Sequence, residues 1–296
     1  MSAVIGRVTS GMTARAAQHH LQANLQRMST LMERASGQRA ILRPSDDPVG
    51  TGDSLRLRSE QRAAEQHARN TQDGLGWLTV ADSAIRTSVD LLVRARDLAL
   101  QGATGTASQQ ARDALAEEID GIRDALLTEA NASYNGRSVF AGTSDAGVAF
   151  SEDGTFQGVP GSSVVRRIGP DEQLRVDVDG AAVFGSGAGS VFAVLETLAA
   201  DLRAGADVSG SITAISERRE EVLGHLSQVG VRYNRLEAAK VATEQRLGRI
   251  EAGIVEVEDV DLARMIIDLK SQEVAYQSAL GVTARVLQNS LMDFIR

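Results

Sequence analysis

The chain contains no cysteine, which excludes disulfide bonds, thiolate metal sites and cysteine nucleophiles together. Aromatic residues are also scarce, at 3% of its 296 residues. Three tyrosines, six phenylalanines and one tryptophan cannot fill a broad core, whereas Leu, Ile, Val and Ala can fill narrow seams between long helices. The composition therefore favours an elongated helical body.

Long apolar runs are missing as well. No stretch approaches the roughly 18 apolar residues of a membrane-spanning helix. No apolar segment of about seven residues or more follows the first charges, so we expect no cleavable secretory signal. Within residues 1–43 every charged residue except Glu33 is an arginine, although the whole chain carries a net charge of -8. If the protein leaves the cell, we expect a route that reads no Sec-type signal.

Clusters of reactive side chains are absent too. Of the four histidines, only His19 and His20 are close in sequence, and adjacent residues on a helix cannot face one site. Asp46 and Asp47 have no histidine or further carboxylate beside them, which favours helix capping over a catalytic or metal site. We expect no enzymatic activity, no cofactor and no metal.

The longest regular pattern is an alternation of three- and four-residue steps from Ile212 to Val257. It predicts one continuous helix, about 70 Å long, packed lengthwise against others as in a coiled coil. The members of this seam are Ile212, Ile215, Arg219, Val222, Leu226, Val229, Tyr233, Leu236, Lys240, Thr243, Leu247, Ile250, Ile254 and Val257. The glycines within it each cost about 1 kcal/mol unless close helix contact compensates. A generic coiled-coil oligomer is one interpretation.

Helical spacing recurs in five further segments, which are residues 4–35, 48–100, 108–131, 191–202 and 262–294. Gly37 should stop the first helix, and Asp47 with Pro48 should start the second as N-cap and first helical residue. Gly74 and Gly76 predict an irregularity in the second helix beside Trp77, which we expect to pack in a seam.

The sequence pattern changes between the helices expected over residues 108–131 and 191–202. Asn135-Gly136 is a hairpin signal, and the glycine-rich stretch after it holds short β-prone runs. These runs are residues 138–141, 148–150, 164–168 and 174–178. We expect a small β domain here, with Gly185–Gly189 as an exit loop, since it lacks the lysine of a phosphate-binding loop.

Both ends of the chain are amphipathic and are expected to pair with each other. The expected seam of the N-terminal helix contains Leu21, Leu25, Met28, Met32 and Ala35. That of the C-terminal helix contains Leu262, Ile266, Leu269, Glu273, Tyr276, Leu280, Thr283, Leu287, Leu291 and Phe294. The arginine-rich start could instead bind nucleic acid or a membrane surface, but it lacks clustered lysines and interleaved aromatics.

Four motifs in this order resemble the flagellin superfamily. They are Arg43-Pro44-Ser45-Asp46-Asp47-Pro48, the stretch Arg69–Gly74, the stretch Asn135–Thr143 and the tail from Asp261 to Phe294. The resemblance covers residues 1–143 and 190–296. The first and third motifs look more like the hook-associated protein of the hook–filament junction (FlgL type) than like filament flagellin, which is the alternative. Arg43 stands where the family commonly has asparagine.

The resemblance implies a mainly α, elongated rod of coiled-coil-like helices with a small β-rich insert. It implies a structural component of the bacterial flagellum, exported unfolded by the type III apparatus and located outside the cell. The expected partners are further copies in a ring, the first hook-associated protein on the hook side, flagellin on the filament side and an export chaperone. No nucleic acid and no membrane insertion are expected.

Three parts are expected from this reasoning. Residues 1–43 and 259–296 form a terminal assembly layer, residues 44–137 and 190–258 a helical rod, and residues 138–189 an outer β domain. The candidate assembly interface contains Val8, Met12, Leu21, Leu25, Met28, Leu269, Tyr276, Leu280, Leu287, Leu291 and Phe294. The candidate linker motif contains Pro44, Ser45, Asp46, Asp47 and Pro48.

Overall fold

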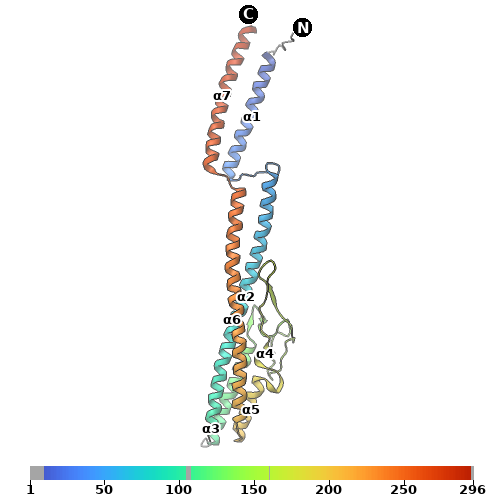
Figure 1. Cartoon of the computed structure of the whole chain (residues 1–296), viewed down its shortest axis with the longest axis vertical. Helices are drawn as coiled ribbons and strands as arrows, with labels where there is room; N and C mark the ends of the chain where they lie inside the picture. The colour runs from blue at the N-terminus through green and yellow to red at the C-terminus, as the bar shows by residue number, and fades with distance from the viewer. Residues whose placement is uncertain (1–9, 105–107, 160, 295–296) are drawn as a thin grey trace. The chain divides into compact units, whose positions relative to one another are not determined.

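The computed structural model describes residues 10–104, 108–159 and 161–294, and the fold is mainly α with a small β-rich region (Figure 1). The chain divides into two compact units. The terminal unit contains α1 (Ser10–Gly37), α7 (Leu262–Phe294), the start of α2 (Pro48–Gly102) up to residue 61, and the end of α6 (Ser209–Glu258) from residue 248. The central unit contains residues 62–247.

In the terminal unit, α1 and α7 run antiparallel side by side (Figure 1). Gly37 ends α1, as expected, and Gln38 follows with a positive φ of 53°. Asp261 begins α7, since its Oδ1 accepts from the Ala263 and Arg264 amides at 3.0 and 3.1 Å. The predicted pairing of the two end helices is confirmed.

The seam between α1 and α7 differs in part from the expected one. On α1 the half-buried positions with 3,4 spacing are Ala17, Leu21, Asn24, Met28, Leu31 and Ala35. On α7 the corresponding positions are Met265, Leu269, Gln272, Tyr276, Ala279 and Thr283, of which Met265 is buried. Gln272 Nε2 donates to Asn24 at 3.3 Å, which fixes the register. The expectation that Leu25, Met32, Leu262, Ile266 and Leu280 belong to this seam is wrong, because these side chains are exposed.

The central unit is built on long helices around one apolar core. Besides parts of α2 and α6, it contains α3 (Gln109–Ala130) and α5 (Val191–Ala204), which pack against each other. Ser108 and Ser190 cap them, each accepting a main-chain amide at 3.2 Å. Gly205 closes α5 in the left-handed conformation. The predicted helices of this unit are confirmed.

The predicted seam of α6 is confirmed residue by residue. Six of its members are buried at strict seven-residue intervals: Ile215, Val222, Val229, Leu236, Thr243 and Ile250. Every other member of the seam is half-buried, so none points into solvent. A repeat of seven rather than 3.6 residues is typical of helices that pack lengthwise against neighbours.

The expected irregularity at Gly74 and Gly76 is wrong, since α2 is one helix from Pro48 to Gly102. Both glycines instead admit close neighbours. A Cβ at Gly74 would lie 3.0 Å from Val176 and 3.1 Å from Leu236, and one at Gly76 would overlap the ring of Tyr134. Tyr134 in turn packs edge-on against the buried Trp77 at 6.2 Å. The glycines thus serve helix packing.

The β-rich region is smaller than the sequence suggests. β1 (Ser133–Tyr134) and β2 (Arg137–Ser138) form a hairpin around Asn135 and Gly136, both with positive φ, as the Asn-Gly signal predicts. β3 (Val165–Arg167) pairs antiparallel with β4 (Gln173–Arg175). Two short helical turns follow, α4 (Gly180–Phe184) and η1 (Gly187–Gly189), the latter inside the expected exit loop.

The strands expected over residues 138–141 and 148–150 are reduced to Ser138 in β2 and to an isolated bridge between Phe150 and Phe156. Core packing and side-chain bonds hold much of this segment. Asn131 Oδ1 accepts the amides of Ala149 and Phe150 at 2.8 and 2.9 Å, and its Nδ2 donates to the Phe150 carbonyl at 2.8 Å. The few aromatic rings concentrate here. Phe140, Phe150, Phe156, Phe184 and Phe192 form one cluster with ring centroids 5.1–6.2 Å apart.

Candidate assembly surface and linker

The linker motif Pro44–Pro48 is exposed and ends in a helix cap. Asp47 Oδ1 accepts the amides of Val49 and Gly50 at 3.1 and 2.9 Å, so the predicted capping role is confirmed. Asp46 accepts the Arg43 amide at 3.3 Å and lies 3.8 Å from the guanidinium of Arg34 on α1. The two carboxylates therefore shape the connector between α1 and α2.

A polar cluster at the end of α6 was missed by sequence reasoning. Glu258 accepts from Ser54 Oγ at 2.5 Å and from Arg58 Nε and Nη2 at 2.8 and 2.6 Å. These bonds and the charge of Arg58 lower the pKa of Glu258 to about 2. The only sequence signal is that Ser54 and Arg58 are four residues apart and so share a helix face. Their partner lies about 200 positions away, which no local pattern reveals.

Of the candidate interface residues, Leu21, Met28, Leu269 and Tyr276 lie half-buried within the α1–α7 pair. Met12, Leu25 and Leu280 are instead exposed, at 61%, 42% and 43% of their surface. Val8 lies outside the described residues, as do the side chains of Leu287, Leu291 and Phe294. Some of the candidate residues therefore pack between α1 and α7, and others are exposed on the surface of this pair.

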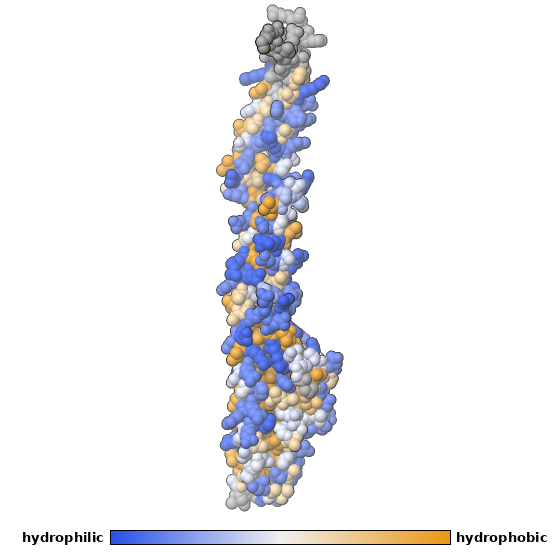
Figure 2. Space-filling model, turned by 45° about the vertical axis from the view of Figure 1, so that its right-hand side comes forward, coloured by the Kyte–Doolittle hydropathy of each residue, from blue (hydrophilic) through white to orange (hydrophobic). Residues whose placement is uncertain are grey.

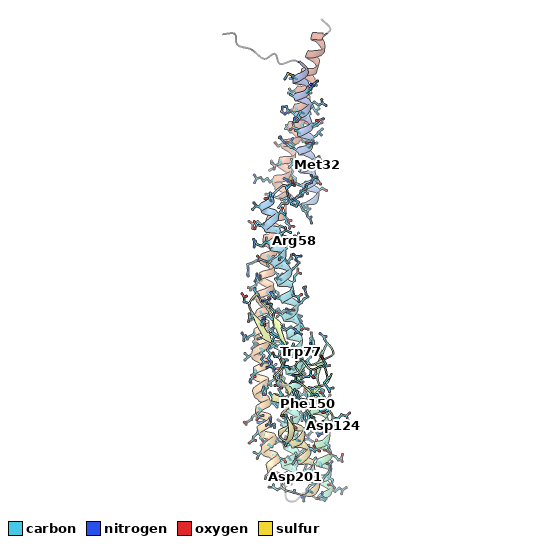
Figure 3. All side chains as sticks on the ribbon, turned by 90° about the vertical axis from the view of Figure 1, so that its right-hand side faces the viewer. Met32, Arg58, Trp77, Asp124, Phe150 and Asp201 are labelled. Atoms are coloured by element: carbon cyan, nitrogen blue, oxygen red, sulfur yellow. The ribbon has the colours of Figure 1, made fainter. Side chains whose placement is uncertain are left out.

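Apolar side chains remain exposed on both α1 and α7 after the two helices have paired. The exposed large hydrophobic residues of this pair are Met12, Leu25, Met32, Leu262, Ile266, Ile267, Val274, Leu280 and Val282. Met32 is labelled on α1 in Figure 3, and Figure 2 shows apolar side chains scattered among polar ones on the visible face of the pair. Leu25 and Met32 on α1, like Ile267 and Val274 on α7, lie seven residues apart, as they would in a second helical seam.

The motif Arg69–Gly74 anchors the β-rich region to α2. Asn70 Nδ2 donates to the Arg167 carbonyl at 2.8 Å, and Arg166 Nε donates to Asp73 at 2.7 Å. On the other side, Arg232 of α6 donates to the Asp177 carbonyl at 2.8 Å, and burial lowers the pKa of its guanidinium. These contacts fix the insert on the helices.

Within the part of the chain that the structure describes, no group of three or more His, Asp or Glu side chains is placed to hold a metal ion. None of the described helices is both long and apolar enough to cross a membrane. The arrangement is one of helix packing, capping and ion pairs.

Comparison with known proteins agrees with this arrangement. Residues 8–145 match the model of the bacterial flagellin N-terminal helical region. Flagellin A of Vibrio anguillarum is 36% identical over 137 residues, which are 46% of this chain and 36% of the relative. The chain thus spans about a third of the length of this curated relative. A flagellin of Halalkalibacterium halodurans is 24% identical over 289 residues, covering 95% of this chain and 96% of the relative.

Solved structures give the fold. A protein from Vibrio parahaemolyticus described as a flagellar hook-associated protein superposes with a TM-score of 0.67 at 21% identity, covering 72% of this chain and all of the other. The flagellar junction protein FlgL of Legionella pneumophila superposes with a TM-score of 0.56 at 14% identity, covering 70% of this chain and 100% of the other. Residues 8–145 therefore resemble the N-terminal helical region of bacterial flagellin, and the chain has the fold of these flagellar hook-associated proteins.

Proposed function

We propose that this chain is a structural subunit of the bacterial flagellum, located outside the cell at the junction between hook and filament. Its partners are further copies in a ring, the first hook-associated protein on the hook side and flagellin on the filament side. An export chaperone holds the chain before it leaves the cell. The likeness in fold to hook-associated proteins, the junction protein FlgL among them, favours the junction over the filament.

The observation that carries this proposal is the apolar surface left on the α1–α7 pair. An isolated pair of helices needs one apolar seam on each helix, and the pair has that seam already. The heptad-spaced pairs Leu25 with Met32 and Ile267 with Val274 lie outside it, in solvent. Burying the remaining exposed part of such side chains against neighbouring subunits contributes about 1–2 kcal/mol per residue, which favours assembly over a free monomer. We assign residues 1–43 and 259–296 to this assembly layer.

A charge on the exposed seam tests the role of α7. Ile267→Asp should leave the helical circular-dichroism signal of the soluble protein unchanged, because Ile267 is 67% exposed in the monomer. The same variant should abolish swimming, since a carboxylate would be buried in the assembled layer. Gln277→Asp, an equal charge at an exposed polar position of α7, is the control and should swim. Normal motility of the Ile267→Asp strain would remove this face from the assembly interface.

A junction subunit and a filament subunit differ in their location on the flagellum and in whether their self-association continues. A junction subunit has two different neighbours, so its self-association stops at a closed layer. Cells lacking the protein should keep their hooks and lose exported flagellin to the medium. Immunogold label should mark one spot at the distal end of the hook. Label along the whole filament would support the filament reading, which the flagellin related over 95% of this chain keeps open.

A further inference from the structure

Glu258 joins three segments within the terminal unit. It is the last residue of α6, and its carboxylate binds Ser54 and Arg58 on the first turns of α2 at 2.5–2.8 Å. Its main-chain carbonyl accepts the Ala40 amide at 2.7 Å, and the next residue, Asp259, forms a β-bridge with Arg39. One residue therefore ties the connector after α1 to both α2 and α6.

We propose that Ser54, Arg58 and Glu258 form an acid-sensitive latch that holds the connector, residues 38–47, against the ends of α2 and α6. The Glu258 side chain is 17% exposed, and its partner Arg58 is 48% exposed. Two cations face it, Arg58 from α2 and Arg39 from the connector. A polar cavity of about 350 Å³, lined by these groups with Ile41 and Thr51, gives water and protons access to the carboxylate.

The latch is closed at neutral pH and opens as the pH falls. Hydrogen bonds from Arg58 and Ser54 lower the pKa of Glu258 from its usual 4.5 to about 2. A lowered pKa means that the bonds favour the charged carboxylate, so their contribution is complete above about pH 4.5 and is lost as the pH falls toward 2. A protonated carboxyl group no longer forms the ion pair with Arg58, and the latch opens.

The later part of the connector is loosely held. Residues 40–42 are half-buried, whereas residues 43–47 are exposed, and the contact of Asp46 with Arg34 spans 3.8 Å, which is long for an ion pair. The Ala40 amide is thus a local reporter, because its hydrogen bond to Glu258 lasts only while the end of α6 is held in place. Opening frees this amide without disturbing the core of the central unit.

Hydrogen–deuterium exchange of the soluble protein tests the latch without any assembly step. At pH 7, Glu258→Gln should speed exchange in the peptide over residues 38–47 by about tenfold or more. Glu256→Gln, at an exposed neighbouring position of α6, is the matched control and should exchange like the wild type. Wild-type protein should approach the Glu258→Gln behaviour, after correction for intrinsic rates, as the pH falls from about 4.5 toward 2.

Fluorescence of the buried Trp77 and far-ultraviolet circular dichroism should stay unchanged in each variant. If Glu258→Gln fails to fold, Ser54→Ala, which removes a single bond, should raise exchange at the same peptide by a smaller factor. Equal exchange in Glu258→Gln and wild type, or equal acceleration in Glu256→Gln, would overturn the proposal. Because no partner is involved, this result is independent of the junction assignment.

Discussion

The same substitution, glycine to alanine, should have opposite effects at two helical positions of the central unit. Gly224 lies in the middle of α6, and a Cβ there would have no atom within 4 Å. Gly76 lies in the middle of α2, where a Cβ would overlap the hydroxyl and ring of Tyr134. Intrinsic helix propensity is equal at the two sites, so any difference reports packing.

The magnitudes follow from the two environments. Gly224→Ala gains about 0.5–1 kcal/mol of unfolding free energy, because alanine loses less backbone entropy on folding and meets nothing. Gly76→Ala has the same gain, but it displaces Tyr134 from Trp77, which lies 6.2 Å away in an edge-on pair. Overpacking costs about 1–3 kcal/mol, and a lost aromatic pair about 0.5–1.5 kcal/mol. The net effect is a loss of roughly 0.5–4 kcal/mol.

Urea denaturation followed by circular dichroism measures both values, with Trp77 fluorescence as the second probe. Gly121→Ala on α3, also with open space at its Cβ, is the control and should match Gly224→Ala. In thermal melts we expect the Tm of Gly224→Ala to lie about 1–4 °C above that of the wild type, and the Tm of Gly76→Ala to lie several degrees below it. If Gly76→Ala is as stable as Gly224→Ala, the reasoning that Gly76 exists to admit Tyr134 is refuted.

Four further substitutions test other contacts. Leu236→Ala, at a fully buried heptad position, should cost about 2–5 kcal/mol of unfolding free energy, whereas Leu223→Ala, on the exposed flank of α6, should cost less than about 1 kcal/mol in the same urea titration. Asn131→Ala leaves two amides and one carbonyl unpaired, so it should cost about 2–3 kcal/mol and speed proteolysis of the loop around Phe150. Asp47→Ala removes the cap of α2 and should cost about 1 kcal/mol, seen as faster amide exchange in the first turn of that helix.

The helices of both units could be predicted from the sequence because the signal accumulates over many turns. Along α6, eleven of the fourteen positions of one seam are apolar, so the polar residues Arg219, Lys240 and Thr243 do not hide the pattern. Caps at Asp47 and Ser108 were predictable for a different reason, since capping depends only on a residue and the amides two or three positions later.

The β-rich region was less predictable because its structure depends on distant partners. Residues 148–150 have β-prone composition, yet Asn131 takes up the amides of Ala149 and Phe150, and both of these side chains are buried, Phe150 within the phenylalanine cluster. Strand propensity reflects a fit to a half-buried surface more than a backbone preference, so it fails where side chains supply the bonds. The Glu258 latch was hidden for the same reason, since Ser54 and Glu258 are 204 positions apart.

The α1–α7 seam shows why hydrophobicity alone can assign residues to the wrong face of a helix. Sequence reasoning selected Leu25 and Met32 because they are apolar, whereas the pair uses Asn24 and Leu31, one position earlier. A helix with one apolar face leaves no such choice, because its other face is polar. Here both phases carry apolar residues, so the helix has more apolar surface than a single partner covers. The ambiguity in the sequence and the exposed side chains in the structure therefore have one physical cause, which is a helix suited to two neighbours at once.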